Sequence, residues 1–228
     1  MIDIANGPFT GFTPDTLVFL RTLAANNNKA WFEEHKDQYR QLLQEPLQQL
    51  ALALSGSLMA IDHDLIIEPR RVVSRIYRDT RFSRNKSPYK TTMWLTYKRP
   101  LTNWQDAPAY FFEIAADSYR FGMGFYSASK GTMDRLREEI EQREERFRQA
   151  VAFLGEQDTF VLEGELCKKV RKPDLPDDLQ EWHMRKNLYL VCNRQPDESL
   201  STRRLADDLG KGFFLLAPFY GYLSALSG

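Results

Sequence analysis

The stretch AYFFEIAADSYRFGMGFY, residues 109–126, decides the fold class of this chain. It contains two runs of aromatic and β-branched residues, 109–114 and 119–126, and the turn-forming pair Asp117-Ser118 lies between them. Residues of these types favour strands, and two such runs around a polar turn are typical of neighbouring antiparallel strands. We therefore expect a mostly antiparallel sheet, with further strands at Trp94–Tyr97 and Asn187–Cys192.

Helical spacing of apolar residues is found both before and after these strands. Thr13-Pro14-Asp15 is typical of a helix start, and the helical pattern continues to Leu58 with an interruption at Pro46. After the strands we expect one long charged helix at 132–151. Another is expected at about 201–216, with a short tail after Pro218.

The order of helices, then strands, then helices predicts an α+β protein. Its helical N-terminal segment is expected to pack on the mostly antiparallel sheet, with further helices in the C-terminal third. A chain of 228 residues fits one large domain, and no repeat or low-complexity linker divides it. We therefore expect a single domain over residues 1–228, with residues 1–12 as a loose tail.

The composition is that of a globular protein, with 43% hydrophobic residues and equal numbers, 31 each, of basic and acidic residues. The N-terminus lacks the pattern of a signal peptide. The longest apolar run, Phe213–Phe219, is far shorter than the ~20 residues that span a bilayer. The two cysteines and three histidines follow no metal-binding spacing. We expect a cytoplasmic protein without membrane association, metal or cofactor.

Positive charge is concentrated in one segment, residues 68–90, with the sequence EPRRVVSRIYRDTRFSRNKSPYK. Glu68 and Asp79 are its only acidic residues, so the segment carries a net charge of +6 and the other 205 residues carry −6. Such a concentration attracts anions. The basic residues are Arg70, Arg71, Arg75, Arg78, Arg81, Arg84, Lys86 and Lys90.

The side chains of this segment suit a phosphate-bearing ligand, because the planar guanidinium group binds phosphate through two hydrogen bonds and keeps its charge. Asp79 could orient a guanidinium group or act as a general base, with Glu113 of the sheet as a candidate acid. The candidate ligand-binding residues are Arg75, Arg78, Arg81, Ser83, Lys86, Tyr89 and Lys90.

The local structure of the basic segment is open between two alternatives. A strand would place basic residues on both faces, whereas a helix would align Arg71, Arg75 and Arg78 opposite the apolar residues. Residues 83–88 are expected to form a loop in either case. The structural alternative to anion binding is that several of these arginines pair with acidic residues from the rest of the fold.

The motif RIYRDTRFSRNKSPYK, residues 75–90, resembles the signature of the domain-of-unknown-function 2461 family. Residues 12–40 resemble the opening helices of that family. GMGFY, residues 122–126, before a helix that carries Leu136 and Arg137, resembles a third block. The resemblance covers residues 12–219 and implies one α+β domain without an established activity. It carries over Arg75, Arg78, Asp79, Arg81, Phe82, Ser83, Lys86, Pro88, Tyr89 and Lys90, with Asn27, Trp31 and Phe32 from the first block.

Familiar catalytic signatures are absent from the sequence. It has neither a P-loop nor a Gly-x-Ser-x-Gly elbow, and Gly122-x-Gly124 is better explained by close backbone packing or a bulge than by dinucleotide binding. The leading hypothesis is an Arg-rich pocket for a phosphate-bearing small molecule, and the residues leave open whether the protein is an enzyme. The alternatives are a nucleic-acid-binding module on the same basic face and a non-catalytic domain that docks an acidic protein surface.

Overall fold

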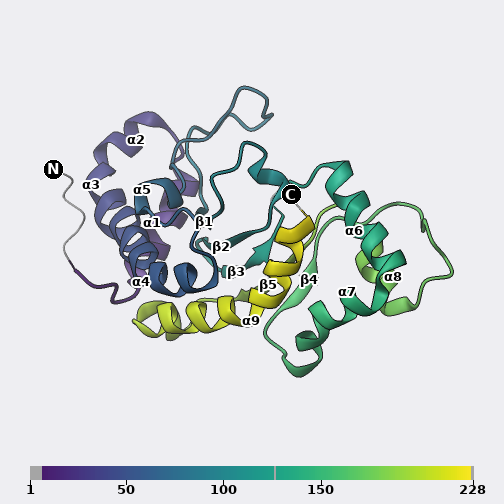
Figure 1. The fold of residues 1–228 in the computed structure, drawn as a ribbon. Coiled ribbons are helices and arrows are strands. Elements are labelled where there is room, and N and C mark those ends of the chain that lie inside the picture. The colour runs from purple at the N-terminus through teal and green to yellow at the C-terminus, as the bar shows by residue number, and fades with distance from the viewer. Residues whose placement is uncertain (1–6, 126, 227–228) are drawn as a thin grey trace. The chain divides into compact units, whose positions relative to one another are not determined.

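The computed structural model describes residues 7–125 and 127–226 (Figure 1). Its first quarter is helical, as predicted: α1 spans Pro14–Ala25, α2 Lys29–Glu34, α3 Lys36–Tyr39, α4 Glu45–Ile61 and α5 Pro69–Val72. A π-helical turn, Arg40–Gln44, joins α3 to α4. Pro14 and Pro46 stand in first turns, where a missing N–H costs nothing. Asn28 caps α2, because its side-chain oxygen accepts a hydrogen bond from the backbone N–H of Trp31.

Within the described residues, five strands form one antiparallel sheet in the order β1-β2-β3-β5-β4. The strands are β1 (Met93–Tyr97), β2 (Ala109–Ile114), β3 (Tyr119–Gly124), β4 (Val161–Glu163) and β5 (Tyr189–Arg194). The α+β class is thus confirmed, and the predicted strands correspond to β1, β2, β3 and β5. The end of the predicted run at Tyr126 lies outside the described residues. β4 was not predicted, because it is only three residues long, all of them paired with β5.

The prediction of one long helix at 132–151 is wrong. Two helices, α6 (Lys130–Gln142) and α7 (Glu144–Val151), are separated at Arg143. Arg143 has a non-helical backbone, and its side chain donates to Glu139 of the preceding turn. Glu144 and Glu145 follow in the first turn of α7. Acidic residues are favourable there, next to the positive end of the helix dipole.

The last helix, α9 (Arg204–Leu226), continues through Pro218, so the predicted end near Leu216 and the tail after Pro218 are wrong. Proline removes one helical hydrogen bond, but the apolar pattern continues beyond it. Phe219, Tyr220 and Leu223 are all buried, and this packing holds the helix together past the proline. The Pro- and Asp-rich connector also contains an unpredicted helix, α8 (Asp177–His183).

The contacts group the chain into two compact units, and strands β2, β3 and β5 contribute residues to both. The first unit is Met1–Tyr97, Phe111–Phe121 and Asn193–Lys211, and the second is Lys98–Tyr110, Gly122–Cys192 and Gly212–Gly228. The expectation of a single domain stays a prediction. No helix of the described residues has the length and apolarity that crossing a membrane requires.

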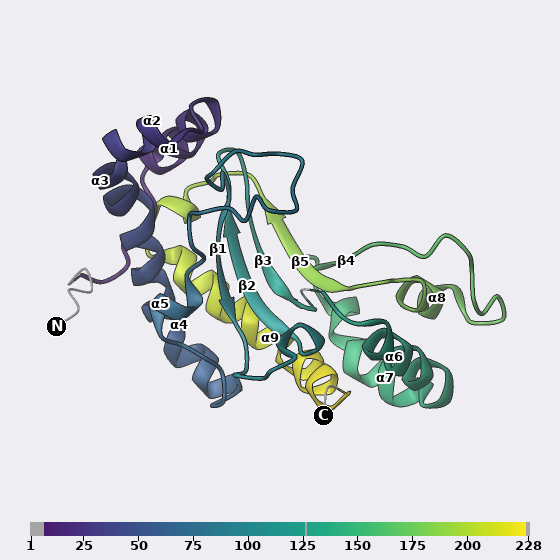
Figure 2. The same ribbon diagram turned by 90° about the horizontal axis from the view of Figure 1, so that it is seen from above.

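The core of the first unit includes part of the segment expected to be a loose tail. Residues 1–6 of that segment lie outside the described residues, but Phe9 and Phe12 are buried. The ring of Phe12 stacks on Phe112 of β2, with 5.9 Å between centroids, and its backbone N–H donates to the carbonyl of Leu200. Residues 9–12 are therefore not loose. In the same unit, α4 and α5 lie beside β1 (Figure 2).

The second unit has an aromatic core and close contacts between strand backbones. Phe147, Trp182 and Phe219 pack edge to face, with centroids 5.3–6.4 Å apart. A Cβ atom on Gly122 would overlap the carbonyl oxygen of Leu190 on β5. This confirms the prediction that Gly122-x-Gly124 reflects close backbone packing.

Candidate functional site

The basic segment forms a short hairpin rather than a continuous strand or helix. Helix α5 ends at Val72, and the chain then pairs residues 76–78 with residues 88–90. Tyr77 bridges Tyr89, the N–H of Arg78 donates to Pro88, and the N–H of Lys90 donates to Ile76. We call residues 75–90 the basic hairpin and residues 79–87 its loop. The loop is the uppermost trace in Figure 1.

The hairpin is anchored to the N-terminal helices through Tyr89. The side chain of Asn27 donates to the carbonyl oxygen of Tyr89 at 2.9 Å and accepts from its N–H at 3.0 Å. The ring of Tyr89 is 3% exposed and stacks on Phe32 with 4.0 Å between centroids. Burial raises the pKa of Tyr89. Tyr89 was a candidate ligand-binding residue, but the structure buries its side chain, where it anchors the hairpin.

Arg81 is the one loop arginine with an acidic partner among the described residues. Its Nε and Nη2 donate to the two carboxylate oxygens of Asp79 at 3.0 and 2.7 Å. Hydrogen bonds from Arg81 lower the pKa of Asp79 to about 2. A carboxylate with so low a pKa, and with both oxygens engaged, is a poor base at neutral pH. The geometry therefore favours the alternative in which Asp79 orients the Arg81 guanidinium group.

The other arginines of the hairpin have no such partner within the described ranges, 7–125 and 127–226. Arg75 and Arg84 are exposed and Arg78 is half-buried. In the part of the chain that the structure describes, their side chains make no ion pair or hydrogen bond. Just outside the hairpin, Arg71 pairs with Glu68 at 3.0 Å. The ion pairs of Arg71 and Arg81 are thus local, and no acidic residue from elsewhere in the described chain pairs with the hairpin.

The two lysines stabilise the hairpin itself. Lys86 Nζ donates to the carbonyl of Thr80 at 2.9 Å and so closes the loop, in which Ser83 is half-buried. Lys90 Nζ donates to the carbonyl of Arg75 at 2.7 Å and lies 4.3 Å from the centroid of the Trp94 ring. Desolvation and the nearby Arg75 charge lower the pKa of Lys90. Both lysines thus hold backbone carbonyls of the hairpin, and both add to its positive field.

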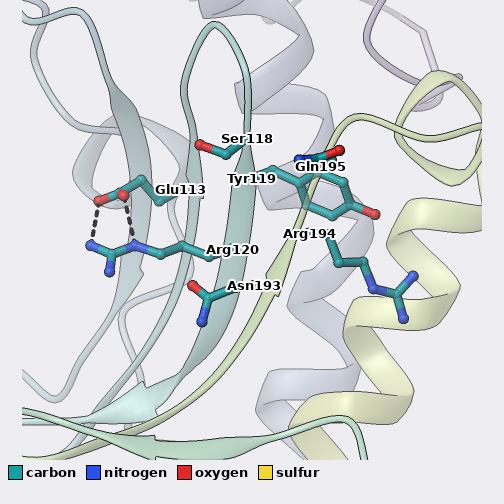
Figure 3. A pocket seen from close by; sticks show the side chains of 7 residues that line it. All are labelled: Glu113, Ser118, Tyr119, Arg120, Asn193, Arg194 and Gln195. Atoms are coloured by element: carbon teal, nitrogen blue, oxygen red, sulfur yellow. Dashed lines mark hydrogen bonds and ion pairs between the residues drawn. The ribbon is translucent and has the colours of Figure 1, made fainter.

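Glu113, the candidate acid, lies on β2 and pairs with Arg120 of β3 (Figure 3). Arg120 Nε and Nη2 donate to its two oxygens at 2.7 and 3.3 Å. The structure thus brings Glu113 to Arg120, and Asp79 to Arg81. The Glu113–Arg120 pair borders a cavity of about 240 Å³, and no residue of the basic hairpin lines this cavity. The cavity is lined by Glu113, Ser118, Tyr119, Arg120, Asn193, Arg194 and Gln195.

A buried guanidinium group in the second unit was not singled out by residue chemistry. Arg137 of α6 is 6% exposed and donates to the carbonyl oxygens of His183 and Arg185 and to Asp134. It therefore ties α6 to the end of α8. His183 is also buried, and its Nε2 lies 2.9 Å from Glu141. The described residues contain no group of three or more His, Cys, Asp or Glu that could hold a metal ion.

N-terminal helices, a five-stranded antiparallel sheet and an anchored basic hairpin define an α+β protein with an exposed arginine cluster. Residues 15–222 match the family described as conserved hypothetical protein (DUF2461), so the chain belongs to that family. The resemblance carried by residues 75–90 is thereby confirmed. No curated protein matches the chain significantly. Function therefore has to be argued from the site.

Proposed function

We propose that the basic hairpin binds the phosphate groups of a ligand. The observation that carries this proposal is the state of Arg75, Arg78 and Arg84. Their guanidinium groups have no acidic partner among the described residues, and they stand on one short hairpin. Guanidinium groups grip phosphate through paired N–H donors and remain charged at any physiological pH.

The Asp79–Arg81 pair supports the same function. The carboxylate occupies Nε and one N–H of Nη2, and it fixes the plane of the guanidinium group. A guanidinium group has five N–H donors, so three remain available to a second anion. Asp79 thus acts as a positioning residue in this proposal, and it offers no base for catalysis.

The remaining hairpin contacts favour a preformed surface. Lys86 and Lys90 each donate to a backbone carbonyl, and Asn27 fixes Tyr89 from outside the hairpin. A surface that is ordered before the ligand arrives loses less conformational entropy on binding. A phosphate-bearing small molecule is the first ligand class to test, because the arginine forks require only phosphate oxygens.

The test is calorimetric titration at low salt with pyrophosphate, ribose 5-phosphate and a nucleoside triphosphate. The double variant Arg78→Ala/Arg84→Ala is expected to lose at least about ten-fold in affinity, equivalent to ~1.4 kcal/mol, with unchanged unfolding free energy. Arg203→Ala is the matched control, since Arg203 is also exposed and its side chain makes no ion pair or hydrogen bond among the described residues. Equal affinities in all three proteins, or no binding of any phosphate compound, would refute the proposal.

A further inference from the structure

The loop of the basic hairpin exposes a large aromatic side chain. Phe82 is 94% exposed, the highest value among the exposed large hydrophobic residues of the described chain. The guanidinium carbon of Arg81 lies 5.7 Å from the centroid of its ring. A single exposed apolar residue needs no explanation by itself. Phe82, however, lies within the arginine cluster that the phosphate-binding proposal uses.

A second exposed ring belongs to the same hairpin. Tyr77 is 56% exposed, although it contacts Tyr89 and Phe32 at the base of the hairpin. Phe82 has no such ring packing on its faces, and only the Arg81 contact is found at its ring among the described residues. Aromatic rings interspersed with arginines are the recurring surface of proteins that hold single-stranded nucleic acid, because bases stack on the rings while cations hold the backbone.

We propose that the ligand of the basic hairpin is a single-stranded nucleic acid, with one base stacked on Phe82 and its flanking phosphates bound by the neighbouring arginines. This inference rests on the phosphate-binding function proposed above. It adds the base as a second recognition element. Arg81 and Arg84 flank the ring in sequence and both are exposed, so they are the arginines assigned to the phosphates beside that base.

A duplex fits this surface less well. In a duplex each base face is covered by its neighbours, so an exposed ring finds no partner without unstacking a step. An anionic lipid surface is the other class of partner with which a basic loop and an exposed ring could associate. One ring flanked by Arg81 and Ser83 offers little apolar area for insertion into a bilayer.

The experiment measures fluorescence anisotropy of the full chain with a labelled oligothymidylate of about 12 nucleotides, within the usual range of binding-site sizes. An abasic oligomer of the same length carries the same phosphates without bases. We expect the oligothymidylate to bind about 5- to 150-fold more tightly than the abasic oligomer, the range expected for one stacked base. Phe82→Ala should remove this preference and leave binding of the abasic oligomer unchanged, whereas Phe82→Trp should retain it.

The control variant is Phe214→Ala, which removes another exposed phenylalanine, 49% exposed on α9, and should change nothing. Equal binding of both oligomers by the unchanged protein would overturn the base-stacking inference and leave phosphate binding standing. Failure to bind either oligomer and also pyrophosphate would overturn both proposals. Binding to vesicles of anionic lipid that depends on Phe82, without oligomer binding, would replace the nucleic acid by a membrane surface.

Discussion

Asn27 and Tyr89, 62 residues apart in the chain, are joined by two hydrogen bonds between one side-chain amide and one backbone peptide. The amide of Asn27 donates to the carbonyl of Tyr89 and accepts from its N–H, as a neighbouring strand would. The ring of Tyr89 meanwhile stacks on Phe32, five residues beyond Asn27. The base of the basic hairpin is therefore fixed by the helix start at residues 27–32.

The first prediction concerns this pair. Asn27→Ala should lower the free energy of unfolding by about 1–3 kcal/mol, because both polar groups of a partly buried peptide lose their partner. Asn27→Asp keeps the acceptor oxygen, so its free energy of unfolding should lie between those of the parent protein and Asn27→Ala. Urea denaturation measures the effect. Asn103→Ala, at an exposed site, should stay within about 0.5 kcal/mol of the parent, and an equal loss there would contradict the assignment.

The second prediction concerns the pKa of Asp79. Because its pKa in the folded protein lies below the usual value, the ion pair with Arg81 contributes stability above about pH 4. That contribution is lost as the pH falls through about 2. Arg81→Ala should raise the pKa of Asp79 from about 2 toward ~3.9. Carboxyl carbon NMR over pH 1.5–6 follows this titration, and an unchanged midpoint in the variant would disprove the pairing.

A third prediction tests the buried guanidinium group of Arg137. Its removal in Arg137→Met leaves the carbonyls of His183 and Arg185 and the carboxylate of Asp134 without their donor. Breaking a buried ionic contact of this kind costs about 3–5 kcal/mol. Urea denaturation of the Arg137→Met variant measures this loss in the free energy of unfolding. Arg135→Ala, two residues earlier and exposed, is the control and should cost less than about 1 kcal/mol.

The glycines supply a fourth prediction with its control in the same chain. Gly122→Ala places a methyl group against the Leu190 carbonyl and should force β3 and β5 apart, with a loss of several kcal/mol or failure to fold. Gly56→Ala, inside α4 with nothing within 4 Å, should instead stabilise by about 0.5–1 kcal/mol. Thermal denaturation of both variants decides the matter. Equal effects of the two changes would show that β3 has room for a side chain.

The sequence predicted the α+β class because its evidence is local. The runs 109–114 and 119–126 are rich in aromatic residues, which are enriched in strands, and a polar turn separates them. The errors arose where tertiary packing decided the outcome. Pro218 is a helix breaker by local rules, yet buried residues on its far side hold α9 together. β4 is too short to leave a pattern of its own.

The sequence indicated where the basic hairpin lies, but not the contacts within it. A cluster of charge is visible in composition alone, and residues 68–90 could be selected for that reason. The separate roles of its residues could not be predicted, because no local pattern shows that Asn27 bonds to Tyr89 or that Tyr89 is buried. The exposure of Phe82 likewise follows from the conformation of the loop, which no local sequence pattern indicates.

The anchor of the basic hairpin and its loop are encoded by different residues. Asn27, Phe32 and Tyr89 hold the base, whereas the side-chain hydrogen bonds and ion pairs found for residues 79–87 within the described chain stay inside the loop. Substitutions in the loop should therefore cost less folding stability than substitutions at the anchor. A change at the anchor, in contrast, should lower the free energy of unfolding and so reduce the fraction of the protein that presents the loop at all.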